Sequence, residues 1–116
     1  MREIIRDPGR LRHILEAIEH ILQYMDGISY EELEKDLLRT HAVAYNIQII
    51  GEASYKLTKD FKEAHSETPW NLIEKMRHIL VHDYFAVDLE FVWEVIRDDI
   101  PTLHQQVTEY LKEFEK

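Results

Sequence analysis

Residues 36–57, DLLRTHAVAYNIQIIGEASYKL, are the stretch that decides the fold. Apolar side chains recur there at helical spacing along two separate faces. One stripe comprises Ala42, Tyr45, Ile49 and Ala53, and the other comprises Val43, Ile47 and Ile50. A helix that is apolar on two sides is buried on two sides. We therefore predict either the central helix of a bundle or a helix with the core on one side and a second subunit on the other.

Local signals on both sides of this helix predict further helices. Asp7 before Pro8 is typical of a helix start, and Thr68–Pro69 repeats the pattern. Ser29 and Glu32 have the spacing of a capping box, and Asp88 can cap a later helix. Residues 58–68 are polar and predict a loop. Pro101 is expected either to kink the last helix or to begin a new one.

Amphipathic stripes support four helices besides the long one. They comprise Leu11, Ile14, Leu15, Ile18, Leu22 and Met25; Leu72, Ile73, Met76, Ile79 and Leu80; Leu89, Val92, Val95 and Ile96; and Leu103, Val107, Leu111 and Phe114. No strand-like alternation competes with them. We expect an all-α, antiparallel bundle of about five helices that forms a single domain over residues 1–116.

Composition narrows the function classes. The chain has 116 residues, no cysteine and a formal net charge of −9. Disulfides and thiolate chemistry are therefore impossible, the negative charge argues against a chain-wide basic surface for binding nucleic acid, and DNA is not expected as a partner. No apolar run approaches the roughly 20 residues that span a bilayer, and the N-terminus lacks the apolar core of a signal peptide. We expect a cytoplasmic protein with no membrane partner.

Residues 76–85, MRHILVHDYF, carry the most chemistry, and three interpretations are open. The histidines can simply be solvated on a surface helix. Alternatively, Glu74, His78 and His82 have i, i+4, i+8 spacing that suits zinc. A further ligand would then come from one of three other histidines: His13, His20 and His41.

The third interpretation is acid–base chemistry on a phosphodiester. Histidine exchanges a proton near neutral pH, and arginine matches phosphate oxygens with a forked set of donors. Cleavage of RNA by its own 2′-hydroxyl needs those two groups and no metal. On one regular helix Arg77 and His82 would point about 140° apart and could not easily surround a phosphate. Pairing two subunits would solve this by bringing two copies of the segment into one cleft. Periodicity alone does not choose among the three interpretations.

The segment resembles the R-x-x-x-x-H-x-Y signature of HepT-like proteins in the HEPN group, here Arg77, His82 and Tyr84. The residue after the arginine is usually polar in that group, often asparagine, and is His78 here. The resemblance extends over nearly the whole chain. Its blocks, in order, are RDPGRLRHILEAIEHILQY (6–24), NIQIIGEASYKL (46–57), TPWNLIEKMRHILVHDYFAVD (68–88) and DDIPTLHQQV (98–107).

This resemblance implies a small helical toxin of a prokaryotic toxin–antitoxin pair. HepT-like proteins are homodimeric, metal-independent ribonucleases whose paired motifs line a cleft. An MntA-like minimal nucleotidyltransferase neutralises them by transferring AMP to the motif tyrosine. Carried over, catalysis falls on Arg77 and His82, His78 orients the site or adds a donor, and Tyr84 is AMPylated. Glu52 and Asp83 are expected to support the site, and no cofactor is implied.

One alternative remains within the same group. HEPN domains also serve as non-catalytic modules that bind nucleotides or a nucleotidyltransferase partner.

Gly51 lies inside the long helix, where glycine costs about 1 kcal/mol of stability relative to alanine. We therefore expect another segment to pack closely against it.

Overall fold

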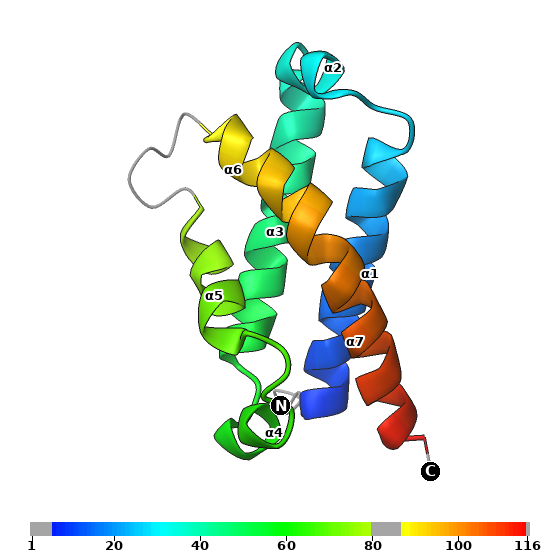
Figure 1. Cartoon of the computed structure of the whole chain (residues 1–116), viewed down its shortest axis with the longest axis vertical. Helices are drawn as coiled ribbons and strands as arrows, with labels where there is room; N and C mark the ends of the chain where they lie inside the picture. Colours follow the sequence, from blue (N-terminus) through cyan, green and yellow to red (C-terminus); the bar gives the residue numbers. More distant parts are fainter. Residues whose placement is uncertain (1–5, 80–86, 116) are drawn as a thin grey trace, which may run out of the picture.

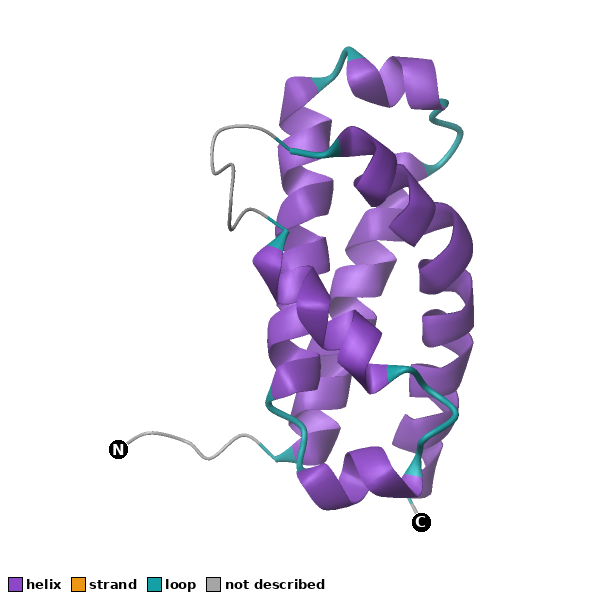
Figure 2. Cartoon of the chain, turned by 60° about the vertical axis from the view of Figure 1, so that its left-hand side comes forward, coloured by secondary structure: helices purple, strands orange, loops and turns teal. Residues whose placement is uncertain are grey.

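A computed structural model describes residues 6–79 and 87–115, and within these ranges all regular structure is helical (Figures 1 and 2). Four helical rods alternate in direction and lie side by side (Figure 1). They are α1 (Asp7–Met25); α3 (Leu37–Tyr55); α5 (Trp70–Glu74) with the 3₁₀ turn η1 (Lys75–His78); and α6 (Leu89–Glu94) with the π-helical turn η2 (Val95–Asp99) and α7 (Ile100–Glu113). The prediction of an all-α antiparallel bundle is confirmed.

Two short helices close the ends of the bundle (Figure 2). The first, α2 (Tyr30–Glu34), joins α1 to α3, and the second, α4 (Lys59–Ala64), joins α3 to α5. The described residues thus form about six helices, and the predicted loop over 58–68 is wrong at α4. Thr58 caps α4 by accepting the amide hydrogen of Phe61 at 3.2 Å, and the Phe61 ring is buried. One buried aromatic anchors a helix that is too short for a periodic pattern to reveal.

Helix α3 packs into the core along one of its two predicted stripes. Val43, Ile47 and Ile50 are fully buried. On the second stripe Ala53 is buried, whereas Tyr45 is 65% exposed in this single chain. Leu38, on the same outward side, is 82% exposed. The helix therefore has the core on one side and uncovered apolar side chains on the other.

The core joins residues from the rods at both ends of the sequence. Helices α1 and α7 lie side by side, and each is packed against its neighbours through a buried apolar stripe (Figure 1). Their fully or almost fully buried residues are Leu11, Ile14, Ile18, Ile21, Ile100, Leu103 and Val107. Besides Tyr45, three residues of the predicted stripes are exposed: Leu22 is 42%, Leu72 is 64% and Phe114 is 45% exposed. Ile21, next to Leu22, takes an inward position instead, and Ile73, predicted together with Leu72, is buried.

Two predicted helix starts differ from the observed ones. Arg6, rather than Asp7, is the N-cap of α1. The Asp7 carboxylate instead accepts hydrogen bonds from the backbone nitrogen of Thr58 at 2.9 Å and from its hydroxyl at 2.7 Å. Pro69, rather than Thr68, is the N-cap of α5. In both cases a tertiary hydrogen bond takes the polar side chain that sequence reasoning assigned to its own helix.

Other local predictions are confirmed. The capping box of α2 is complete, with Ser29 and Glu32 bonded reciprocally at 3.1 and 3.2 Å. Asp88 caps α6 by accepting from the Phe91 nitrogen at 3.2 Å. Pro101 lies in the first turn of α7, directly after the π-helical turn. Among the residues described, no helix is both long and apolar enough to cross a bilayer.

Candidate functional site

The site begins with a contact between two backbones. Helix α3 and turn η1 approach so closely at Gly51 that an added Cβ would lie 2.2 Å from the Arg77 nitrogen and 2.8 Å from the Met76 carbonyl carbon. Backbone atoms cannot rotate away as a flexible side chain can, so glycine is required here. The predicted close packing at Gly51 is confirmed, and it fixes where the Arg77 side chain leaves the bundle.

The guanidinium of Arg77 rests on an aromatic ring. Its central carbon lies 3.6 Å from the centroid of the Tyr55 ring, which is a cation–π contact. Tyr55 is four residues after Gly51, so both face the same side of α3. Arg77 Nε also donates to Nε2 of His78 at 3.2 Å. We call Tyr55, Arg77 and His78 the Arg77 site.

Turn η1 is a 3₁₀ helix, whereas the sequence predicted a regular α-helix here. Adjacent residues of a 3₁₀ helix point about 120° apart. The contact between Arg77 and His78, which the sequence placed on opposite flanks of the apolar stripe, is therefore made by the ends of their long side chains. In this contact Nε2 of His78 is the acceptor and Arg77 Nε is the donor.

Glu52 forms no ion pair with Arg77 in the described structure. It lines a shallow hollow beside α1 together with Arg10 and His13. Within residues 6–79 and 87–115, no carboxylate forms an ion pair with Arg77. The terminal nitrogens of the guanidinium therefore have no protein acceptor in this part of the chain. His82, Asp83 and Tyr84 lie outside the described residues, so their roles stay predictions.

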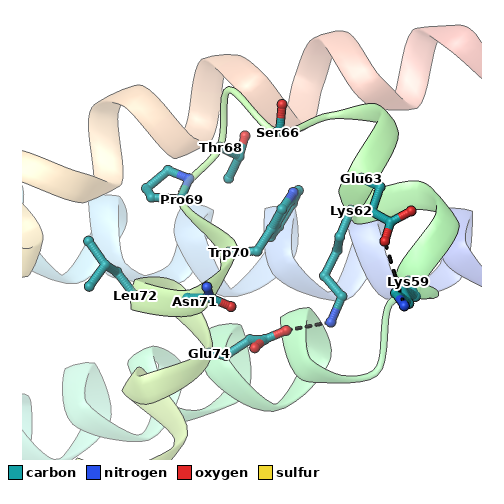
Figure 3. Close-up of a pocket in the computed structure, with 10 residues that line it drawn as sticks. All are labelled: Lys59, Lys62, Glu63, Ser66, Thr68, Pro69, Trp70, Asn71, Leu72 and Glu74. Atoms are coloured by element: carbon teal, nitrogen blue, oxygen red, sulfur yellow. Dashed lines mark hydrogen bonds and ion pairs between the residues drawn. The ribbon is translucent and has the colours of Figure 1, made fainter.

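Glu74, a ligand in the zinc interpretation, is engaged by a lysine. Its carboxylate pairs with the Lys62 ammonium, and both side chains are only about one-fifth exposed (Figure 3). Lys62 also donates to the backbone oxygen of Tyr55 at 3.4 Å. This pair borders an open hollow of about 750 Å³ between α4 and α5, above the Trp70 ring (Figure 3). A paired carboxylate is a poorer metal ligand, and no three metal-binding side chains converge among the residues described.

A second polar group of residues lies where α4, the following loop and α7 meet. We call it the closed cluster; it comprises His65, Glu67, Thr68, Gln106, Tyr110 and Glu113. The Thr68 hydroxyl lies 2.6 Å from the Tyr110 hydroxyl and 2.7 Å from Oε1 of Gln106, and Tyr110 donates to Glu67 at 2.8 Å. Burial of Tyr110 raises the pKa of its hydroxyl to about 12.

His65 completes the closed cluster. Its Nδ1 lies 2.9 Å from the Phe61 carbonyl oxygen and its Nε2 lies 3.0 Å from the Glu113 carboxylate. Burial alone would lower the His65 pKa, but these two acceptors together with the nearby Glu67 charge outweigh it, so the pKa is raised above its usual 6.5. Every member of the closed cluster thus has a partner within the fold.

Comparison with known proteins identifies the class. Residues 14–110 match the family model described as Ribonuclease HepT-like, so the chain belongs to this family. A protein of Caldanaerobacter subterraneus subsp. tengcongensis, named "Putative RNase TTE0752", is 43% identical over 88% of this chain and 91% of its own length. "Probable ribonuclease HepT" of Thermococcus cleftensis is 41% identical over 80% of this chain and 84% of its own length.

A third relative is longer. "Gamma-glutamylcyclotransferase and putative RNase MJ0434" of Methanocaldococcus jannaschii is 38% identical over 91% of this chain, which matches 48% of that protein. No solved structure matches this chain significantly. The family resemblance read from the sequence is confirmed.

Sequence reasoning missed one residue of the Arg77 site. Tyr55 lies outside the R-x-x-x-x-H-x-Y signature, and it reaches the site through tertiary packing. The available signal was its spacing of four residues from Gly51, once Gly51 was expected to contact another segment.

Proposed function

We propose that this protein is a metal-independent endoribonuclease in which Arg77 and His82 perform the cleavage. Family membership supports ribonuclease chemistry, and both residues occur at the spacing of the R-x-x-x-x-H motif. One observation carries the proposal. Arg77 is fixed by its backbone at Gly51 and by its guanidinium on Tyr55, with its terminal nitrogens free of protein carboxylates in the described ranges. Such a guanidinium suits a phosphate.

The chemistry follows from the residue types. His82 removes the proton of the 2′-hydroxyl or protonates the leaving 5′-oxygen. The 2′-oxygen attacks the adjacent phosphorus, and Arg77 stabilises the charge that gathers on the phosphoryl oxygens. The products carry a 2′,3′-cyclic phosphate and a 5′-hydroxyl. His78 accepts a hydrogen bond from the Arg77 Nε and so directs the other guanidinium nitrogens toward the substrate.

A homodimer is part of the proposal. One chain supplies one His82, whereas the reaction needs a base and an acid, and two copies provide both. The outward side of α3 supports pairing, because Leu38 and Tyr45 are 82% and 65% exposed in the single chain. Large uncovered apolar side chains of this kind are typical of protein interfaces.

The proposal includes a toxin role and its control. An MntA-like nucleotidyltransferase would transfer AMP to the Tyr84 hydroxyl. The added phosphodiester brings bulk and negative charge close in sequence to Arg77 and would compete with the substrate phosphate for it. Glu52 and Asp83 are retained as supporting residues of this proposed site.

The test is cleavage of single-stranded RNA in EDTA by protein that mass spectrometry shows to be unmodified. We expect cleavage that leaves 2′,3′-cyclic phosphate ends and is lost in Arg77→Ala and His82→Ala. Arg97→Ala is the matched control, because Arg97 is exposed, lies in η2 and is paired there with its neighbour Asp98. No cleavage by unmodified protein, or equal cleavage by all variants, would contradict the mechanism and favour the binding-module alternative.

A further inference from the structure

We propose that Tyr55 is a positioning residue for Arg77. It holds the guanidinium by its face and leaves the in-plane N–H groups free for a phosphate. The inference deepens the proposed function and rests on it. The direct observation is the 3.6 Å separation between the Arg77 central carbon and the Tyr55 ring centroid.

The contact follows from how the two segments pack. The Arg77 backbone is fixed against Gly51, and Tyr55 is one helical turn further along the same face of α3. The arginine side chain must therefore cross the α3 surface at the position of the Tyr55 ring. Lys62 secures this end of α3 in turn, since its ammonium donates to the Tyr55 backbone oxygen and pairs with Glu74.

The type of contact determines which donors stay free. A guanidinium has five N–H groups, all in its plane, and a carboxylate partner would occupy two of them. An aromatic ring contacts the face of the plane and occupies none. In the described ranges only Nε of Arg77 has a hydrogen-bond acceptor, namely His78. Tyr55 thus restrains the orientation of Arg77 without competing with a phosphate for the outer nitrogens.

The exposure of Tyr55 agrees with a positioning role. The residue is 49% exposed, so its ring contributes little to the core, and we expect its replacement to leave the bundle folded. This separates it from Gly51, whose replacement disturbs the packing of η1 itself. Tyr55→Leu removes the aromatic face, and Tyr55→Phe keeps it and removes only the hydroxyl.

The experiment compares wild type, Tyr55→Phe and Tyr55→Leu. Tyr24→Leu is the matched control, because Tyr24 stacks on His20 of α1 and makes no contact with Arg77. Two measurements do not depend on activity. The first is the ring-current shift of the Arg77 side-chain resonances in NMR spectra, and the second is the affinity for inorganic phosphate followed at the Arg77 Nε–Hε signal. The third measurement is kcat and KM for RNA cleavage.

We expect the Arg77 ring-current shift in wild type, Tyr55→Phe and Tyr24→Leu, and its loss in Tyr55→Leu. In Tyr55→Leu alone, the phosphate Kd rises and kcat/KM falls, each by about threefold or more. Unchanged phosphate affinity and Arg77 signals in Tyr55→Leu would overturn the inference. A rise in KM for RNA without any change in phosphate binding would also overturn it and make Tyr55 a base-stacking surface.

The readouts separate this inference from the proposed function. If wild-type protein fails to cleave RNA, the proposed ribonuclease mechanism fails, and the ring-current and phosphate measurements still decide whether Tyr55 positions Arg77. If wild type cleaves RNA and Tyr55→Leu matches it in all three measurements, the mechanism stands and the role of Tyr55 is rejected.

Discussion

The Arg77 site and the closed cluster contain the same kinds of side chain and use them differently. Each combines a histidine, a tyrosine and other polar groups beside packed helices. In the closed cluster the polar atoms satisfy one another, from Glu113 through His65 and from Glu67 through Tyr110 to Thr68. In the Arg77 site the cation contacts the face of the Tyr55 ring and the His78 imidazole, and its outer nitrogens have no partner in the described structure.

This difference separates stabilisation from reactivity. A buried polar group with all its hydrogen bonds made contributes to a unique fold, and it has no spare capacity for a ligand. A fixed cation with free donors contributes less to the fold and is ready for an anion. Substitutions in the closed cluster should therefore reduce stability and spare catalysis, and substitutions in the Arg77 site should do the reverse. Gly51 is the exception, because its contact with η1 matters both for the stability of the bundle and for the position of Arg77.

Gly51→Ala should have the largest effect. Its Cβ would lie 2.2 Å from the Arg77 nitrogen, so η1 must move away from α3. We expect the free energy of unfolding to fall by about 3 kcal/mol and RNA cleavage to be lost. Urea denaturation and the cleavage assay test this. Gly27→Ala is the control, because it adds a Cβ in open space and meets only the strain of φ +70°, which costs about 1 kcal/mol. Equal losses in the two variants would contradict the packing argument.

Thr68→Val tests the closed cluster. Thr68 is 1% exposed, and valine removes the hydroxyl that contacts Tyr110 and Gln106. We expect a loss of about 2 kcal/mol in the free energy of unfolding, with cleavage per folded molecule unchanged. Thr108→Val is the matched control, since the Thr108 hydroxyl donates only to the His104 carbonyl of its own helix. Lost activity in a variant of undiminished stability would show that the closed cluster acts in catalysis.

Glu74→Gln tests the ion pair beside Tyr55. Removing one charge leaves the Lys62 ammonium, about one-fifth exposed, without its counter-charge. We expect the free energy of unfolding to fall by about 1 kcal/mol. The Lys59–Glu63 pair is the control, because its side chains are 85% and 65% exposed and Glu63→Gln should cost less than about 0.5 kcal/mol. A double-mutant cycle with Lys62→Met measures the coupling, and a coupling near zero would contradict this account.

The smallest expected effect is a pH dependence at His65. Its folded-state pKa is raised above 6.5, so the imidazolium stabilises the fold. That stabilisation is complete below pH 6.5 and is lost as the pH rises through the folded-state pKa. The difference in melting temperature between wild type and His65→Gln should therefore shrink from pH 5.5 to pH 9, on the order of a few degrees at most. A difference that grows with pH would reverse the sign of the argument.

Features that depend on neighbouring residues were predictable from the sequence. The capping box at Ser29, the cap at Asp88 and the helical class of the fold are local, and the structure confirms them. Gly51 was also predictable, because a glycine inside a helix needs a packing reason. The caps were predictable because each capping side chain bonds within the first turn of its own helix. Gly51 was predictable because a glycine at that position is unusual in a helix.

Features that depend on distant residues were not predictable. Asp7 and Thr68 have the chemistry of helix caps, and each is taken by a partner far away in the sequence. Leu72 and Ile73 were both predicted to be buried, but the bundle buries only Ile73 and leaves Leu72 64% exposed. The contact between Tyr55 and Arg77 depends on the tertiary packing of η1 against α3 at Gly51, which a sequence pattern does not show. The motif spacing identified the family, and the described structure added the surroundings of its arginine.

The adjacency of α1 and α7 has a consequence for how the protein is made (Figure 1). During synthesis α1 leaves the ribosome long before the buried residues Leu103 and Val107 of α7 exist. The nascent chain therefore exposes one apolar side of α1 until the last rod is complete. A chain that stops before α7 should therefore be recognised by chaperones and proteases as unfolded.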